Sequence, residues 1–174
     1  MNYILNFAST EKLIYLPEKE GRMKKFSLLI SLMVLFAVYT NSQNINEIEG
    51  VYYAGAELYT GNYKTYFANG NTKMEMNLDK GLKNGEVHIY FENGKLNEIR
   101  KYKDNKMDGT WVTFNENNKK VALANYKDGI KNGQWMIWDD NGSLIYEMQY
   151  DNGQKTGTWK KFNDGGQLIS ERTF

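Results

Sequence analysis

Hydrophobic residues and glycines recur at a fixed interval of 24 residues from Gly61 to the end of the sequence. Glycine opens each unit, at Gly61, Gly85, Gly109, Gly133 and Gly157. Two positions later stand Tyr63, Val87, Trp111, Trp135 and Trp159, and five positions later stand Tyr66, Tyr90, Phe114, Trp138 and Phe162. Seventeen positions later stand Leu78, Tyr102, Tyr126, Tyr150 and Phe174. No insertion or deletion interrupts the pattern, so the sequence predicts a tandem repeat.

Each unit contains two apolar stretches separated by turn residues, which predicts a β-hairpin. In the fourth unit the first stretch covers residues 133–138, Asn141-Gly142 follows, and the second stretch covers residues 144–150. Asn-Gly tolerates positive φ at both central positions of a tight turn, as the twist of a hairpin requires. The third unit has Asn118 in place of the glycine, and asparagine also tolerates the left-handed region.

We therefore expect an all-β fold, in which five hairpins form one elongated antiparallel sheet. The expected units are 61–84, 85–108, 109–132, 133–156 and 157–174, with residues 43–60 as the N-terminal edge segment. A single hairpin is marginally stable in water, so the rows of aromatic side chains must stack on each other. Residues two and five positions after the glycine lie on opposite faces of a regular strand. Either the first strand of each unit carries a bulge, or aromatic side chains coat both faces.

The N-terminal part of the sequence predicts a signal peptide at residues 23–42. Lys24 and Lys25 precede an apolar run over residues 26–39, and small residues lead to cleavage between Ser42 and Gln43. The apolar run is shorter than the roughly 20 residues of a membrane-spanning helix, so we expect only transient membrane contact. The expected location is periplasmic or secreted. Our hypothesis for residues 1–22 is that they are an upstream extension or an incorrectly assigned start, with translation beginning at Met23.

Composition and charge argue against several classes of function. The formal net charge is +1 with no long run of one sign, so no nucleic-acid partner is expected. The sequence has no cysteine and a single histidine, His88, which excludes thiolate sites and metal sites with two histidines. No nucleophile–base pair, phosphate loop or metal motif is visible. We therefore predict a protein that is not an enzyme and needs no cofactor.

Several local features have a functional and a structural interpretation. Acidic clusters at residues 139–142 and 163–166 resemble cation ligands, but neither matches a calcium loop, and turn chemistry explains both. The candidate interaction surface consists of the four tryptophans, Trp111, Trp135, Trp138 and Trp159. They are either a platform for a partner or the apolar core that stacked repeats must bury, and the period favours the core.

The repeat resembles a known family. The pattern is clearest over residues 133–153 and reads Gly-x-Trp-x-x-Phe, then Asn-Gly-x-Leu, then Glu-x-x-Tyr-x-Asp-Gly. It resembles the MORN-repeat variant of bacterial proteins labelled YwqK-type antitoxins. The resemblance covers residues 60–174 and implies an elongated twisted sheet, association with proteins and no catalytic residues. The first unit departs most from the pattern, with Tyr63 in place of tryptophan and Lys73 where later units have an aliphatic residue.

The leading functional hypothesis is an exported scaffold that mediates protein–protein interaction. One alternative is an antitoxin or immunity-type protein that neutralises a toxin outside the cytoplasm. Another is a carbohydrate- or cell-wall-binding module that uses exposed aromatic residues. The last strand also predicts edge-to-edge self-association, unless Glu171 and Arg172 block that edge.

Overall fold

The computed structural model describes residues 44–174, so the predicted signal peptide, its cleavage site and the upstream extension lie outside the described residues. Within residues 44–174 every regular element is a β-strand, which confirms the predicted all-β class. In this part of the chain no helix has the length and apolarity needed to cross a membrane.

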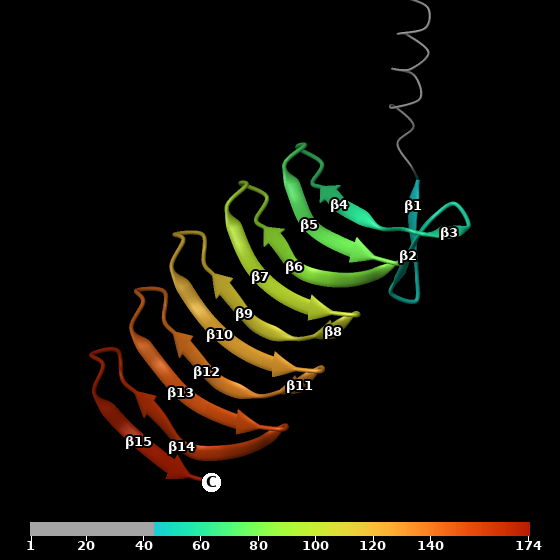
Figure 1. Cartoon of the computed structure of the whole chain (residues 1–174). Helices are drawn as coiled ribbons and strands as arrows, with labels where there is room; N and C mark the ends of the chain where they lie inside the picture. Colours follow the sequence, from blue (N-terminus) through green and yellow to red (C-terminus); the bar gives the residue numbers. More distant parts are fainter. Residues whose placement is uncertain (1–43) are drawn as a thin grey trace, which may run out of the picture. The chain divides into compact units, whose positions relative to one another are not determined.

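The strands form two antiparallel sheets (Figure 1). The small sheet contains β1 (Ile45–Ile48), β2 (Val51–Ala54) and β3 (Glu57–Leu58), in that order. The large sheet has twelve strands, of which β4 and β15 are the outermost. Its strands are β4 (Gly61–Tyr66), β5 (Thr72–Asp79), β6 (Leu82–Tyr90), β7 (Leu96–Lys103), β8 (Lys106–Met107), β9 (Gly109–Phe114), β10 (Lys120–Lys127), β11 (Ile130–Lys131), β12 (Gly133–Trp138), β13 (Leu144–Asp151), β14 (Gln154–Phe162) and β15 (Leu168–Thr173).

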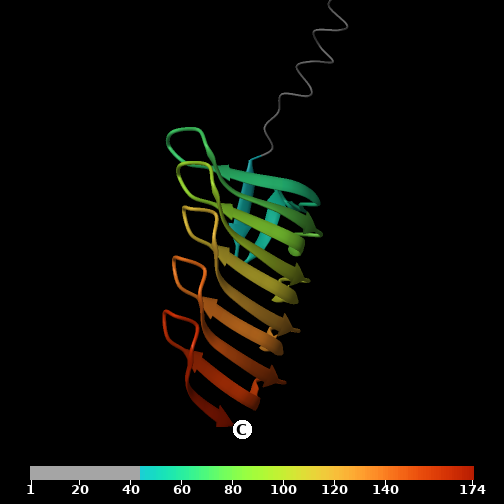
Figure 2. The ribbon, with the colours of Figure 1, turned by 90° about the vertical axis from the view of Figure 1, so that its left-hand side faces the viewer.

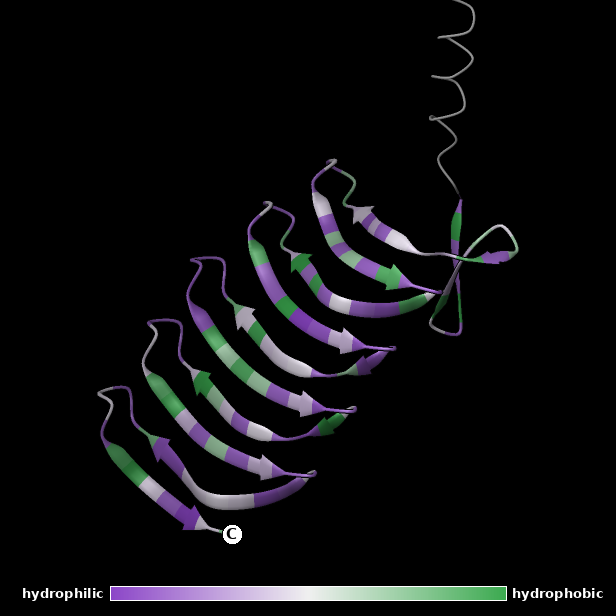
Figure 3. Cartoon of the chain, in the orientation of Figure 1, coloured by the Kyte–Doolittle hydropathy of each residue, from purple (hydrophilic) through white to green (hydrophobic). Residues whose placement is uncertain are grey.

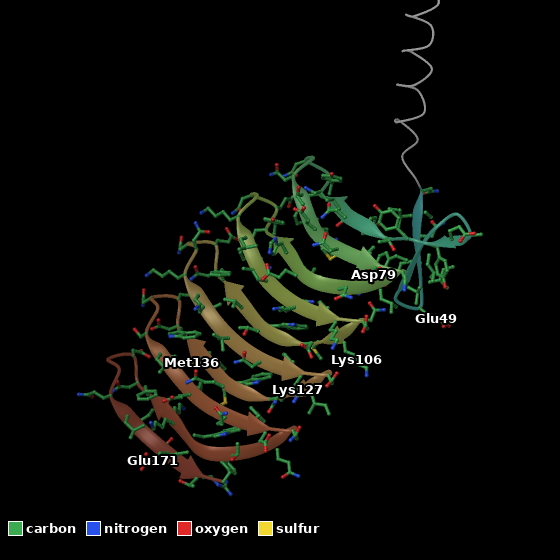
Figure 4. The ribbon with its side chains drawn as sticks, viewed as in Figure 1. Glu49, Asp79, Lys106, Lys127, Met136 and Glu171 are labelled. Atoms are coloured by element: carbon green, nitrogen blue, oxygen red, sulfur yellow. The ribbon has the colours of Figure 1, made fainter. Side chains whose placement is uncertain are left out.

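Each repeat contributes one hairpin to the large sheet, and the hairpins follow each other in chain order. We number them units 1 to 5 from Gly61, Gly85, Gly109, Gly133 and Gly157. The loops within the units stack on each other at one end of the strands (Figure 2). The turns between units lie at the opposite end of the strands, near Asp79, Lys106 and Lys127 (Figure 4).

The tight turns with two left-handed residues lie between the units and not within them. In one such turn Lys80 has φ of 48° and Gly81 has φ of 78°. In another, Asp128 has φ of 50° and Gly129 has φ of 85°. The predicted Asn-Gly turn within each unit is therefore wrong in type, because it is a longer loop in which only the last residue has positive φ, as at Gly142 (91°). Asn141 does not adopt positive φ, and its backbone N–H donates to the Asp139 carboxylate at 2.9 Å. In unit 3 Asn118 takes the glycine's place with φ of 59°, as expected.

A register shift near the loop of each hairpin shows on which face the aromatic residues two and five positions after the glycine lie. Thr65 pairs with Met74 and Tyr66 pairs with Thr72, so Lys73 is the extra residue of a bulge. The bulge lies on the second strand, and the first strand keeps its alternation. Tyr63 is accordingly half-buried on one face, whereas Tyr66 is 60% exposed on the other. Aromatic side chains therefore coat both faces of the sheet.

The buried core lies at one end of the large sheet, where the small sheet packs against it. Tyr52 from β2 is 2% exposed and contacts Met76, Leu78 and Val87, whose exposures are 0%, 3% and 3%. The backbone N–H of Tyr52 donates to the carbonyl of Gly81 at 2.9 Å. Beyond units 1 and 2 the sheet is a single layer, along which hydrophobic and hydrophilic residues alternate (Figure 3).

Candidate interaction face

One face of the large sheet carries a continuous row of aromatic rings. Neighbouring rings lie 5.0–5.6 Å apart between centroids and are tilted by 49–62°. We call this the aromatic row; it contains Tyr102, Trp111, Tyr126, Trp135, Tyr150, Trp159 and Phe174. Tilted contacts at this separation suit the charge distribution of aromatic rings and add about 0.5–1.5 kcal/mol per pair to the effect of burial. The row therefore holds successive hairpins together.

The repeat positions explain why the rings can stack. Tyr150 pairs across the strands with Gly133, which has no side chain and has φ of 95°. The tryptophans are fixed further by their ring N–H groups, which donate to backbone carbonyls ten residues earlier in the sequence. Trp111 donates to Lys101 at 3.2 Å, Trp135 to Asn125 at 3.1 Å and Trp159 to Gln149 at 3.0 Å. Each ring therefore has a defined orientation.

Basic side chains lie over the aromatic row. The Lys131 Nζ is 4.4 Å from the centroid of the Trp135 ring, and the Lys155 Nζ is 4.5 Å from that of Trp159. The Arg100 guanidinium lies 4.9 Å from the Trp111 centroid. Burial alone would lower the pKa of Arg100, but the hydrogen bond and negative charge of Glu98, together with Tyr102, outweigh this and raise the pKa. Cation–π contacts of this kind attract the basic groups to the faces of the rings.

In units 1 and 2 the same face is covered by the small sheet. The Tyr52 ring lies 5.4 Å from the Tyr63 ring, and Ile45 packs beside it. Burial, together with the Glu47 carboxylate, raises the pKa of Tyr52 above its ordinary value. The positions that carry tyrosine and tryptophan in later units carry Leu78 and Val87 here. The smaller side chains leave room for the Tyr52 ring.

In units 4 and 5 no part of residues 44–174 covers the face, and the face is hollowed. A hollow of ≈ 350 Å³ lies beside the aromatic row. Its lining includes Tyr146, Met148, Trp159, Lys161, Arg172 and Phe174. The hollow combines aromatic walls with charged groups, namely the basic residues Lys160, Lys161 and Arg172 and the acidic Glu171, a lining suited to binding.

Comparison with known proteins identifies the repeat. Five successive segments, residues 59–80, 83–104, 107–128, 131–152 and 155–174, match the MORN repeat variant family. These matches cover more than half of the chain. The protein belongs to the MORN repeat variant family.

The other comparisons add little to this assignment. No curated protein matches the chain. Among solved structures, the crystal structure of TarM matches with a TM-score of 0.34 and 17% identity over 76% of this chain. The match spans 27% of that structure's length, and a TM-score this low supports no functional argument. MORN repeats in general form non-catalytic scaffolds that interact with proteins or membranes.

The MORN repeats bring three of the four predicted tryptophans together. Trp111, Trp135 and Trp159 lie in the aromatic row. Trp138 does not, because it follows the row's tryptophan by three residues and lies on the other face near the loop, with the Lys120 Nζ 5.6 Å from its ring centroid. The sequence interpretation missed the lysines over the row. Lys83, Lys131 and Lys155 each stand two residues before a repeat glycine, and this recurrence was the available signal.

The opposite face of the MORN sheet has charged ends and an apolar centre. Lys64 and Glu75 form an ion pair at 3.1 Å in unit 1. Near the other end, Glu147 and Lys160 lie 3.6 Å apart. Between them the cross-strand pairs are apolar and half-buried, and they join Ile99 to Val112 and Leu123 to Met136. These side chains are in contact with each other across the strands, as expected for sheet stabilisation.

The polar motifs weighed as ligand sites have structural roles. The Asp139 carboxylate accepts backbone N–H groups from Asn141 and Ser143 at 2.9 and 2.8 Å, and the Ser143 bond above all lowers the pKa of Asp139. His88 lies 3.1 Å from the Glu86 carboxylate. Residues 44–174 contain no cluster of three or more side chains that would hold a metal ion.

Proposed function

We propose that this protein is an exported, non-catalytic repeat scaffold that binds another protein through the uncovered part of its aromatic face. The observation that carries the proposal is the contrast along one face of the MORN sheet. The first two units are covered by the small sheet, whereas the aromatic row from Tyr102 to Phe174 has no such cover within the described residues. A half-buried apolar surface of this extent is typical of interaction sites.

The geometry of the row favours a protein partner over a carbohydrate. A sugar-binding platform presents an open ring face together with polar groups that hydrogen-bond hydroxyls. Here the tryptophan N–H groups of the row donate to backbone carbonyls, and lysines lie over the Trp135 and Trp159 rings. Tilted rings with a basic rim match the aromatic, hydrophobic and acidic side chains of a protein surface better.

Export rests on the predicted signal peptide at residues 23–42. After cleavage between Ser42 and Gln43, the repeats would act in the periplasm or outside the cell. N-terminal sequencing of the protein from fractionated cells tests this proposal. We expect a mature chain beginning at Gln43 in the periplasm or medium; an uncleaved chain confined to the cytoplasm would contradict export.

The resemblance to YwqK-type proteins makes an extracytoplasmic toxin one candidate partner. If the protein is an antitoxin of this kind, deleting its gene harms the cell only while the gene for the toxin is intact. Equal growth of the single and double deletion strains would remove this candidate, and it would leave the scaffold proposal in place.

Site-specific crosslinking tests the face directly. Ala124 pairs with Trp111 on the aromatic face, whereas its neighbour Leu123 pairs with Val112 on the opposite face. A photoreactive phenylalanine analogue at position 124 is expected to capture a stoichiometric protein partner in cells. The same analogue at position 123 is the matched control. Capture from position 123 alone, or from neither position, would contradict the proposal.

Self-association through the outer strand β15 is a separate prediction. Leu168 and Ile169 on this strand are 49% and 53% exposed, and Glu171 and Arg172 are its charged residues. Exposed apolar edge strands pair readily with other strands. Light scattering at high protein concentration is expected to show oligomers, and a monomer throughout would rule out this pairing.

A further inference from the structure

We infer that the hollow in units 4 and 5 is a socket for an aromatic side chain carried by an acidic β-hairpin of the partner protein. The inference rests on the proposed function and names the chemical class of the partner. Its basis is internal to the molecule: in units 1 and 2 the chain fills the equivalent place with its own Tyr52.

Most of the residues around Tyr52 have equivalents in the lining of the hollow. The Tyr52 cluster includes Met76 and Val87, and Met74, Ile89 and Tyr102 pack against it. Three repeats further along the sequence, the equivalents of these five residues line the hollow, and they are Tyr146, Met148, Trp159, Lys161 and Phe174. Leu78 and Tyr63 belong to the same cluster, but their equivalents, Tyr150 and Trp135, do not line the hollow. The hollow is therefore the translated copy of a site that already holds an aromatic ring.

The basic group beside the site is repeated as well. The Lys83 Nζ lies 5.6 Å from the Tyr52 centroid and 5.8 Å from that of Tyr102. Its equivalent three repeats later is Lys155, which lies 4.5 Å from the Trp159 centroid and 5.0 Å from that of Phe174. A lysine is thus placed to cover an incoming ring in the hollow, as Lys83 covers Tyr52.

The segment that covers units 1 and 2 shows what kind of partner fits. Residues 44–58 contain Glu47, Glu49 and Glu57 and no basic residue. Glu49 lies at the turn between β1 and β2 (Figure 4). This acidic hairpin packs on the part of the face where Lys83 lies over the Tyr52 ring. The lining of the hollow contains three basic residues, Lys160, Lys161 and Arg172, against one acidic residue, Glu171, so its charge complements an acidic partner.

The place that holds Tyr52 and the hollow in units 4 and 5 differ in the space that they leave for a ring, and this difference predicts how strongly a partner binds. Leu78 and Val87 leave room for a ring that is 2% exposed. Tyr150 and Trp159 take these positions in units 4 and 5, so part of the space is already filled. The remaining ≈ 350 Å³ lies at the small end of the range of about 300–1,000 Å³ for ligand pockets. We expect a reversible contact with one inserted side chain, in contrast to the permanent cover of units 1 and 2.

The chain's own hairpin supplies the probe for the experiment. A synthetic peptide of residues 44–58 contains tyrosine and no tryptophan, whereas all four tryptophans of the sequence lie between residues 111 and 159. Tryptophan fluorescence of the purified protein therefore reports peptide binding to units 3–5. We expect a saturable change with this peptide, and binding about tenfold weaker with the Tyr52→Ala peptide, which corresponds to about 1.4 kcal/mol.

Variants of the protein locate the contact. Arg172→Glu, on the exposed outer strand, is expected to weaken peptide binding at least about threefold through charge reversal. Trp159→Ala is expected to abolish the binding, and Trp138→Ala, outside the row, is the matched control that retains it. No saturable change, equal binding of both peptides, or an unchanged affinity of Arg172→Glu would each overturn the inference. A response to anionic lipid vesicles without a response to the peptide would also overturn it.

The inference and the proposed function fail separately. If the peptide does not bind but crosslinking from position 124 still captures a protein, the face is an interaction site for a partner of different chemistry. If neither is observed, both fall.

Discussion

The two ends of the MORN sheet carry the same repeat positions in different surroundings. At the N-terminal end, the small sheet covers the face, and Leu78 and Val87 lie in a core that includes Met76, with 0% exposure. At the C-terminal end, Tyr150 and Trp159 take those positions, and the row ends at Phe174, which is 42% exposed. Under the small sheet, Leu78 and Val87 replace two of the rings, whereas in units 4 and 5 the rings continue and bury each other.

The comparison teaches how a single-layer sheet is stabilised. Without a second layer, apolar area is removed from water only by contacts between neighbours on the same face. Tyrosine and tryptophan at alternating positions provide such contacts, because their rings span the distance between strands. Where a second layer is present, the same rings would occupy the space that Tyr52 needs.

The largest difference between the two ends is expected for the equivalent methionines. Met76→Ala leaves a cavity in the covered core, and we expect it to lower the free energy of unfolding by about 2–4 kcal/mol. Met148→Ala, three repeats later, faces the open hollow and should lower it by less than about 1 kcal/mol. Denaturant unfolding of both variants measures the difference. Equal losses would show that the two ends have the same surroundings.

The turn glycines test how the small sheet docks. A Cβ on Gly81 would lie 2.8 Å from the Tyr52 carbonyl oxygen and 2.8 Å from the Val51 side chain, whereas a Cβ on Gly129 would have no neighbour within 4 Å. Both residues have positive φ, so each alanine substitution should lower the free energy of unfolding by about 1 kcal/mol or more. We expect Gly81→Ala to lower the free energy of unfolding by about 1–2 kcal/mol more than Gly129→Ala does, because only the alanine at position 81 would displace β2. Thermal unfolding of the pair checks this, and identical melting curves would refute the docking contact.

The uncovered end should depend on the hydrogen bonds of its tryptophans. Trp135→Phe keeps a ring in the row but removes the N–H that donates to the Asn125 carbonyl at 3.1 Å. We expect a loss of about 0.5–1.5 kcal/mol in the free energy of unfolding. Trp138→Phe is the control, since that ring lies outside the row, and it should lose less. A larger loss for Trp138→Phe would mean that the row does not hold the hairpins together.

The smallest expected effect concerns the pH dependence at the covered end. The hydrogen bond from Lys64 lowers the pKa of Glu75, so the stabilising contribution of this carboxylate is present above its unfolded-state pKa and is lost as pH falls through the lower folded-state pKa. In Lys64→Gln the Glu75 pKa should rise, and the loss of stability on acidification should be slightly smaller than in the wild type. NMR titration of the Glu75 carboxyl group measures the pKa directly, and an unchanged value would contradict the assignment.

The sequence predicted the repeat and the strands because these depend on local backbone geometry and on the alternation of side chains. It placed the tight turns wrongly, since Asn141-Gly142 and Asp128-Gly129 have similar turn chemistry and only the backbone shows which pair has positive φ at both residues. The bulge opposite Tyr66 depends on the pairing of two strands, so spacing alone left its position open.

The cover over units 1 and 2 was harder to predict, because it depends on contacts between residues that are distant in the sequence. Asn105, for example, donates to the Gly50 carbonyl at 2.9 Å. A signal was nevertheless present. Leu78 and Val87 break the aromatic pattern at two positions of one face, and aliphatic residues at such positions indicate that something else fills the space. The tryptophan period placed three of the four predicted residues in one row of rings, and their role in binding a partner stays a prediction.

The central claim is that one face of the repeat sheet is covered at its N-terminal end and open at its C-terminal end. Mild peroxide oxidation of the native protein, followed by peptide mass spectrometry, tests this at two equivalent methionines. Met148 should be oxidised under native conditions, whereas Met76 should react only at the rate of unfolding. Equal protection of the two methionines, or equal oxidation, would contradict the account.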